Sequence, residues 1–476
     1  MEWLGGALGA EGYEVGRQIL QRGVAAVYLI GFLSAVRQFP ALLGENGLLP
    51  VPRFLEMAGK RAGPTIFRWR YSDRILVAVA WAGSLISILL VLGLPQTGPP
   101  WLPMLAFLII WGLYMSIVNV GQVFYGFGWE SLLLESGFLV AALGSNDVAP
   151  PLLTLLAIRW LVFRLEFGAG MIKMRGDRSW RDLTALHYHH ETQPMPNPAS
   201  RFFHLLPKPL HRIEVAVSHF TQLVVPFFLF APQPLAGFAA VVIIITQVWL
   251  VVSGNFAWLN WLTLILTFSA VPDSFYHALL PTLSIDPVYG PTPVWFAVVV
   301  VLMTLFIAYL SWQPLRNLFA RRQLMNASFN RFHLCDAYGA FGSVTKVRYE
   351  VIVEGTMDDG GPGSRWQAYE FKGKPGDPAR RTRQYAPYHL RLDWLMWFLA
   401  LGSDGGWFTP LLAKLLQADT KILKLLRIDP FDGRRPRYVR ARVFRYRFST
   451  RREKRETGLW WMRDYVGMLV EPVSRK

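Results

Sequence analysis

Long apolar runs follow one another through the first two thirds of the chain, each close in length to a membrane-crossing helix. A helix needs about 20 apolar residues to cross the roughly 30 Å of hydrocarbon in a bilayer. The runs are Gln18–Val36, Ile75–Leu94, Trp101–Val123, Ser131–Gly144, Pro151–Met174, Val215–Ala231, Leu235–Val252, Phe256–Val271 and Pro293–Trp312. Two are unusual, because Ser131–Gly144 is short and contains Glu135, and Pro151–Met174 contains four charged residues. The pattern predicts a polytopic α-helical membrane domain with eight or nine membrane segments.

The links between these runs differ in their content of Lys and Arg. Residues 37–74, 173–212 and 313 onward are rich in basic residues, whereas the links 95–100, 145–150, 232–234 and 272–292 contain none. Cytoplasmic loops of membrane proteins carry the excess of Lys and Arg. If every run crosses once, the basic links share the inner side, the neutral links share the outer side, and the N-terminus lies outside.

The residue pattern changes from about Asn330 onward. Three segments alternate apolar and polar residues as strands do, and two read as helices. The strands are expected at Val344–Glu354, Trp366–Lys372 and Tyr438–Phe448, and the helices at Leu392–Leu401 and Phe408–Leu416. A Gly- and Asp-rich link predicts a hairpin-type loop between the first two strands. We therefore expect a multi-span transmembrane domain over residues 1–325 and a soluble C-terminal α+β domain over residues 326–476.

Composition narrows the classes of function. Apolar residues make up 53% of the chain and charged residues only 17%, below the quarter or so of a typical soluble domain. The net charge of +17 lies beside apolar runs, so membrane lipids with anionic headgroups, and not nucleic acid, are the expected partners. The single cysteine, Cys335, excludes an internal disulfide and a CxxC redox pair. No GxSxG or P-loop motif is present, which argues against a lipase or an ATPase, and no cofactor is predicted.

Several long segments resemble one known family. They are GQVFYGFGWESLLLESGFL (121–139), FRLEFGAGMIK (163–173), HYHHETQPMPNP (187–198), SGNFAWLNWLT (253–263), VEGTMDD (353–359), YEFKGKPGD (369–377) and APYHLRLDWLMWF (386–398). In this order they resemble the lipase maturation factors, and the resemblance extends from about residue 37 onward. It implies a membrane-embedded assembly factor, not a known catalyst, whose partners are secreted lipases or other hydrolases. Vertebrate members lie in the endoplasmic reticulum membrane; a compact, cysteine-poor chain suggests a bacterial member in the plasma membrane.

Two other functions stay open on the residues alone. The chain is alternatively a membrane enzyme, or a lipid-binding protein, that acts on a lipid-soluble substrate through a polar site within the membrane. Four charged residues in one apolar run motivate this alternative: Arg159, Arg164, Glu166 and Lys173. Charges at membrane depth face the protein interior or water and usually pair with one another. These residues therefore either fix helix packing or line a polar cavity for a lipid headgroup or a client segment. Gly168 and Gly170 in the same run permit close approach of another helix.

The basic loop after this run supplies the next candidates, which are Arg175, Asp177, Trp180, Arg181 and Asp182, followed by His187, His189, His190 and Glu191. The first set suits either a salt-bridged loop beside the bilayer or the recognition of an acidic group by Arg side chains. On a strand, His187 and His189 would share a face and could bind one ion. The spacing lacks the HExxH pattern, so no metal is predicted, and a hydrogen-bonded cluster is favoured over acid–base chemistry.

The last candidates lie in the C-terminal domain and are Arg391, Asp393, Trp394 and Trp397. Trp394 and Trp397 are three residues apart and would share a face of a helix. One interpretation is structural: the group anchors the domain on the membrane or on its own core. The other is a client-docking surface, because Trp and Arg are favoured at binding hot spots.

Overall fold

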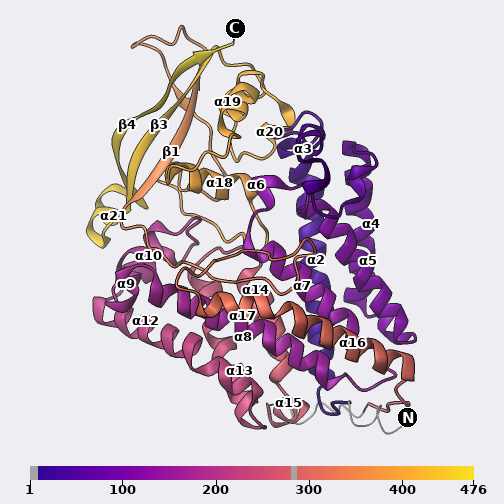
Figure 1. Ribbon diagram of the computed structural model, residues 1–476. Helices are drawn as coiled ribbons and strands as arrows, with labels where there is room; N and C mark the ends of the chain where they lie inside the picture. Colours follow the sequence, from indigo (N-terminus) through magenta and orange to yellow (C-terminus); the bar gives the residue numbers. More distant parts are fainter. Residues whose placement is uncertain (1–8, 280–286, 476) are drawn as a thin grey trace.

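The computed structural model describes residues 9–279 and 287–475. Helices make up the part of the chain before residue 320 (Figure 1). They are α2 (Glu14–Leu42), α3 (Val51–Ala58), α4 (Asp73–Leu92), α5 (Trp101–Val118), α6 (Gln122–Tyr125), α7 (Gly128–Val140), α8 (Leu152–Arg175), α9 (Arg178–Arg181), α10 (Leu186–Thr192), α11 (Ser200–His204), α12 (Lys208–Leu223), α13 (Leu235–Ser253), α14 (Leu259–Thr267), α15 (Asp273–Leu279), α16 (Val294–Leu310) and α17 (Trp312–Phe319). Short 3₁₀ turns are η1 (Gly59–Arg61), η2 (Ile66–Arg68), η3 (Pro95–Thr97), η4 (Ala141–Leu143), η5 (Val225–Phe230) and η6 (Phe268–Ala270).

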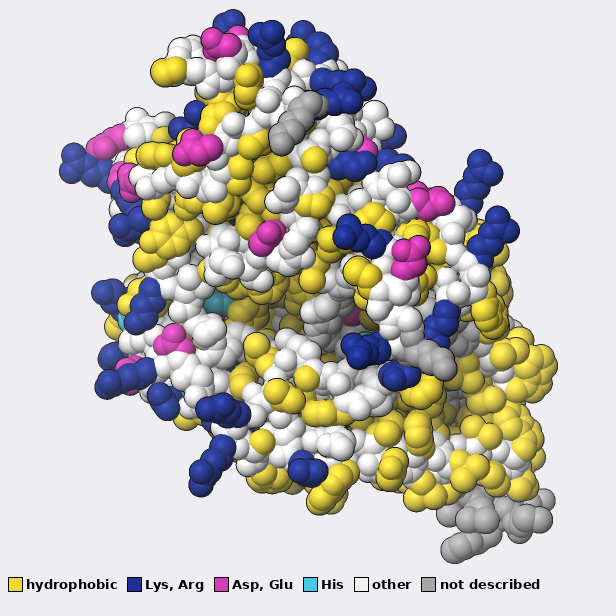
Figure 2. All heavy atoms as spheres, turned by 45° about the horizontal axis from the view of Figure 1, so that its top comes forward, with side chains coloured by type: hydrophobic (Ala, Val, Ile, Leu, Met, Phe, Trp, Pro, Cys, Tyr) yellow, Lys and Arg dark blue, Asp and Glu magenta, His cyan; other side chains and the backbone are white. Residues whose placement is uncertain are grey.

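Within the described residues, six helices are long and apolar enough to cross a membrane. They are Glu14–Leu42, Asp73–Leu92, Trp101–Val118, Lys208–Phe230, Leu235–Ser253 and Val294–Phe319. The chain is therefore an integral membrane protein with a polytopic helical domain. Figure 2 shows the matching surface: hydrophobic side chains cover the lower right, where Figure 1 places α4, α5 and α16, and many Lys and Arg side chains lie toward the top and left.

Helices α7, α8 and α14 occupy the interior of this domain. All but two of the 13 residues of α7 are buried, and its length of about 20 Å falls short of the hydrocarbon thickness. Helix α8 is long enough to cross, but its four charged residues before Arg175 are buried within the protein. By length and composition, six helices of the described residues qualify as spans, and α7, α8 and α14 are the predicted segments that do not. These three segments lie in the interior, where α2, α5, α12, α13 and α16 each pack against at least one of them.

The links between helices fall into two groups, as the charge pattern predicts. The basic side contacts the C-terminal domain: Gln38 donates to the backbone of His389 at 2.7 Å, and Asn255 donates to that of Arg383 at 2.9 Å. Links on the other side contact one another. There, Asn146 bonds Gln96 at 2.9 Å and Gly290 bonds Asp147 at 2.8 Å. Residues 280–286 of the predicted link 272–292 lie outside the described residues.

The C-terminal part is α+β, with one antiparallel sheet in the order β2-β1-β3-β4 (Figure 1). Its elements are β1 (Arg348–Thr356), β2 (Gln367–Ala368), α18 (Arg391–Ala400), α19 (Phe408–Leu416), α20 (Thr420–Leu423), β3 (Tyr438–Phe448), α21 (Arg451–Thr457) and β4 (Trp461–Ser474). The expected hairpin is present, because Glu354 pairs with Ala368. The second strand is much shorter than predicted, and the edge strand β4 was not predicted.

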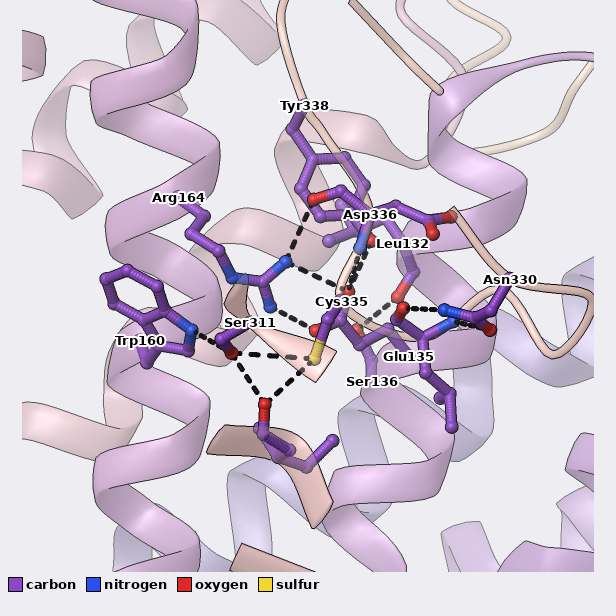
Figure 3. Close-up of polar contacts among 12 residues, drawn as sticks. Leu132, Glu135, Ser136, Trp160, Arg164, Ser311, Asn330, Cys335, Asp336 and Tyr338 are labelled. Atoms are coloured by element: carbon purple, nitrogen blue, oxygen red, sulfur yellow. Dashed lines mark hydrogen bonds and ion pairs between the residues drawn. The ribbon is translucent and has the colours of Figure 1, made fainter. Parts of the chain in front are cut away.

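A buried network of polar groups joins α7, α8 and the segment 334–343 (Figure 3). Arg164 of α8 forms an ion pair with Glu135 of α7, and both side chains are almost fully buried. Arg164 also donates to the backbone carbonyl of Asp336 at 2.9 Å, and the Tyr338 hydroxyl donates to Glu135 at 2.7 Å. The predicted domain boundary at residue 325 therefore separates segments that share one network.

Candidate functional site

A cavity of about 710 Å³ lies where α8, α12, α13 and α14 meet helix α18 and the segment 338–343. This volume is within the range of roughly 300–1,000 Å³ that is usual for small-molecule sites. The cavity is lined by residues from both parts of the chain, so neither part forms it alone. It is the candidate functional site.

Polar groups line the α8 side of the cavity. Glu166 accepts a hydrogen bond of 2.5 Å from Gln247 of α13, and Gln247 accepts one of 2.7 Å from Asn260 of α14. Lys173 donates to Gln222 of α12 at 2.9 Å, and its Nζ lies 4.6 Å from the centroid of the Trp180 ring. Both charged side chains are buried. The carboxylate and the ammonium thus each bond to a neutral amide from a neighbouring helix.

Aromatic side chains form the side of the cavity next to the C-terminal domain. Trp129 and Trp394 pack with ring centroids 4.8 Å apart, and Phe127 lies 5.8 Å from Trp394. His189 contacts the ring of Phe341 in an edge arrangement at 4.9 Å. Burial lowers the pKa of His189 to about 3, so its imidazole is neutral at physiological pH. This wall therefore offers π faces and a neutral ring nitrogen.

Helices α12 and α13 leave the cavity open toward the outer surface. Several large apolar residues line the cavity and are also strongly exposed: Leu210, Ile213 and Val217 on α12, and Ile245 and Trp249 on α13. These helices belong to the six apolar spans, so the opening faces lipid. At the opening, the Trp249 indole donates to Glu214 at 2.6 Å and links the two helices.

Two glycines of α8 set how closely the walls approach. A Cβ on Gly168 would lie 2.5 Å from the backbone oxygen of Tyr338, and one on Gly170 would lie 2.7 Å from a Leu223 side-chain carbon. Gly170 therefore permits the approach of helix α12, as the sequence predicts. Gly168 instead makes room for the segment 338–343, which lines the cavity from the other side.

The structure brings six of the sequence candidates to this cavity: Glu166, Lys173, Trp180, His189, Trp394 and Trp397. Three buried arginines that were also candidates lie outside the cavity and connect different segments of the chain. Arg159 donates to the backbone carbonyl of Ser269 at 2.9 Å, Arg164 belongs to the network described above, and Arg391 donates to Glu130 at 2.6 Å. Burial raises the pKa of Asp393 to about 6, and its carboxylate accepts from the backbone of Gly373.

The loop candidates are dispersed around the site. Arg175 donates to Gln323 at 2.8 Å, and Asp177 caps α9 by accepting from the backbone of Ser179 at 2.7 Å. Asp182 pairs with Arg178 at 3.0 Å on the surface, where Arg181 is exposed as well. The expected salt-bridged loop is thus partly present. The recognition of an acidic group by its Arg side chains stays a prediction.

The histidine segment is helical, so the expectation that His187 and His189 share a strand face is wrong. On α10 they lie two residues apart and point away from each other. His190 lies 3.9 Å from Glu214, and Glu191 lies 3.4 Å from His204 and accepts from the backbone of Phe448. Among the described residues, no three His, Cys, Asp or Glu side chains are grouped so as to hold a metal ion.

The sequence did not point to the carboxylate and the side-chain amides that line the cavity beside Glu166 and Lys173, which include Glu214, Gln222, Gln247 and Asn260. A usable signal was present for two of them. Gln247 and Asn260 interrupt the otherwise apolar runs Leu235–Val252 and Phe256–Val271, and an amide at membrane depth usually finds a partner inside the protein. Glu214 and Gln222 lie on the more polar helix α12 and gave no comparable signal.

Two family models match this chain and together cover most of it. The lipase maturation factor transmembrane domain matches residues 15–278, and the lipase maturation factor C-terminal domain matches residues 334–471. The chain belongs to the lipase maturation factor family. The resemblance of the signature segments is thereby confirmed. The matches meet across the cavity, because α8, α12, α13 and α14 lie in the first and α18 lies in the second.

Individual family members are similar over nearly their whole length. Lipase maturation factor 1 of Bos taurus is 39% identical over 97% of this chain and 89% of the relative. The Homo sapiens protein of that name is 40% identical over 96% of this chain and 88% of the relative. Lipase maturation factor 2 of Homo sapiens is 31% identical over 97% of this chain and 83% of the relative. No solved structure matches this chain.

Proposed function

We propose that this chain is an integral membrane factor that brings secreted lipases or related hydrolases to their active form. The observation that carries the proposal is the match to named lipase maturation factors over both parts of the chain. The alternative of a membrane enzyme has no comparable support. An assembly factor acts by binding an immature client, so the surface of the folded chain is where a client contact belongs.

The outer edge of strand β4 is our candidate for that contact. In the sheet order β4 is terminal, so one row of its backbone N–H and C=O groups is not paired within the sheet. The strand is 14 residues long and exposes Tyr465, Val466 and Leu469. An incompletely folded client offers extended segments, which add to such edges through backbone hydrogen bonds. By contrast, Arg391, Asp393 and Trp394 are nearly fully buried and present little surface to a partner.

The experiment deletes the gene in its own host and measures each secreted lipase as activity and as protein. We expect normal protein with low activity per molecule, restored by the intact chain. The variant Leu469→Lys should restore less activity, and the matched variant Met357→Lys, at an exposed site outside β4, should restore it fully. Unchanged activity per molecule in the deletion strain contradicts the proposed function. Full rescue by Leu469→Lys contradicts only the β4 contact.

We place the chain in the plasma membrane of a bacterium, or in the endoplasmic reticulum membrane of a eukaryotic cell. The charge pattern puts the C-terminal part in the cytoplasm, whereas a secreted client requires a contact on the opposite side. Cysteine labelling distinguishes the two orientations of the C-terminal part. The single native cysteine, Cys335, is buried, so an introduced cysteine supplies the signal. With a membrane-impermeant maleimide on intact cells, Lys424→Cys should react if the C-terminal part faces outward. Thr97→Cys, exposed on the opposite side, should react if it faces inward.

A further inference from the structure

We propose that the cavity between α8, α12, α13 and α14 binds one zwitterionic phospholipid, whose headgroup lies between Glu166 and Lys173. Its acyl chains would leave through the opening between α12 and α13. This goes beyond lipase maturation, and nothing in the family names assigns a lipid to the chain. Three features carry it: the placement of the two charges, the aromatic wall and the lipid-facing opening.

The two charges suit a zwitterion better than an anion. Glu166 and Lys173 are seven residues apart on α8, so they share one face of the helix at a spacing of about 10 Å. They do not pair with each other within the described chain; each bonds to a neutral amide instead. A headgroup that carries a phosphate and an ammonium can bond Lys173 at one end and Glu166 at the other. An anionic headgroup would satisfy Lys173 but would meet Glu166 and Glu214 unfavourably.

The aromatic wall adds a second, independent indication of a ligand. The indole N–H of Trp394 is buried, 3% of this side chain is exposed, and it has no acceptor among the described residues. A buried donor without an acceptor costs about 1–3 kcal/mol in a folded protein, so the described protein groups alone do not satisfy this wall. Trp129 and Trp397 also line the cavity, and aromatic rings attract an ammonium group.

The opening explains why the occupant is a membrane lipid and not a water-soluble amphiphile. Ile213 and Val217 of α12 and Ile245 of α13 line the cavity and are 59%, 48% and 62% exposed. They lie on two of the six apolar helices, so a ligand that passes between them comes from the bilayer. Acyl chains that remain in this opening stay in contact with apolar side chains and lipid, which avoids exposing them to water.

The test uses the full chain purified in mild detergent and exposed to mixed micelles that hold equal amounts of phosphatidylethanolamine and phosphatidylglycerol. Retained lipid is then measured by mass spectrometry. We expect one phosphatidylethanolamine retained per chain in preference to phosphatidylglycerol. Lys173→Gln and Glu166→Gln each remove one charged hydrogen-bonding partner, so each should weaken retention roughly tenfold or more. The matched variants at exposed sites, Lys424→Gln and Glu471→Gln, should retain lipid as the parent chain does.

A second pair of variants tests the opening without touching the buried charges. Val217→Trp fills the opening, and Val224→Trp adds the same bulk to an exposed position of the same membrane segment that does not line the cavity. Only Val217→Trp should lose the lipid. Equal retention by the pair, a preference for phosphatidylglycerol, or a co-purified client segment in place of lipid would overturn the proposal. Loss of lipid with normal lipase maturation would leave the proposed function intact.

Discussion

Removing the charge of Glu135 is expected to destabilise the chain more than any change at its surface. In the network of Figure 3, Glu135 forms an ion pair with the Arg164 guanidinium and accepts a hydrogen bond from the Tyr338 hydroxyl. The substitution Glu135→Gln keeps the shape but leaves the Arg164 cation buried without a counter-ion. Breaking a buried ion pair in this way costs about 3–5 kcal/mol. Tyr338→Phe removes one hydrogen bond to a charged group and should cost about 1.5–3 kcal/mol.

The double variant Glu135→Leu/Arg164→Met separates the charge effect from loss of contact. When both partners are replaced by apolar residues of similar size, the desolvation penalty disappears with the pair. The double variant should therefore be more stable than Glu135→Leu or Arg164→Met alone, and the losses of stability of these two single variants should not add. The assay is the apparent melting temperature in detergent, followed by size-exclusion chromatography of the heated sample. A double variant as unstable as the sum of the two single variants would refute the reasoning.

Three further predictions test other contacts. Gly168→Ala should destabilise the chain by about 1–3 kcal/mol, because its methyl group would meet the segment 338–343. Gly112→Ala should not destabilise the chain, because there is open space around its Cβ. Equal melting temperatures of the two variants would contradict this account of the packing. Burial lowers the pKa of His204 from 6.5 to about 4, so its stabilising contribution is present above pH 6.5 and is lost as pH falls toward 4. Between pH 7 and 5, the free energy of unfolding should therefore fall by up to about 2 kcal/mol less in His204→Gln than in the parent chain. Parallel profiles of stability against pH for the two chains would contradict this. Trp397→Phe removes an indole bond to the backbone of α10 and should cost about 1 kcal/mol by the same melting assay, with a loss above about 3 kcal/mol counting against it.

Helix positions followed from the sequence because each depends on local apolar content. All nine apolar runs are largely helical, and the contacts of the basic and neutral links divide them into two groups. The depth of burial did not follow, since it depends on neighbours far along the chain. Helix α8 carries five charged residues and reads as a poor span, yet it is central because α7, α13 and the segment 334–343 supply partners for Arg164 and Glu166.

The strands show the same division. Tyr438–Phe448 is a strand with the predicted bounds, because its alternation reflects two different faces of the sheet. Residues 344–347 alternate too but precede β1; the backbone of Val344 lies 3.5 Å from Asp177 of the membrane domain. The cavity was not predictable, since Glu166, Gln222, Gln247 and Asn260 come from four helices whose packing no local pattern encodes. Glu166 and Lys173 were visible as charges inside an apolar run, but nothing local placed them opposite these amides.

The ion pair between Glu130 and Arg391 has a consequence for the order of events during synthesis. Its two residues are 261 positions apart, so at roughly 5–20 residues per second the carboxylate precedes its counter-ion by about 13–50 s. The interval is far shorter for Glu135, because its partner Arg164 is synthesised only 29 residues later. The helical domain thus inserts with Glu130 still lacking its counter-ion, and only docking of helix α18 supplies the guanidinium. A ribosome that stops before residue 391 releases a chain that carries this defect, which distinguishes an unfinished molecule from a complete one.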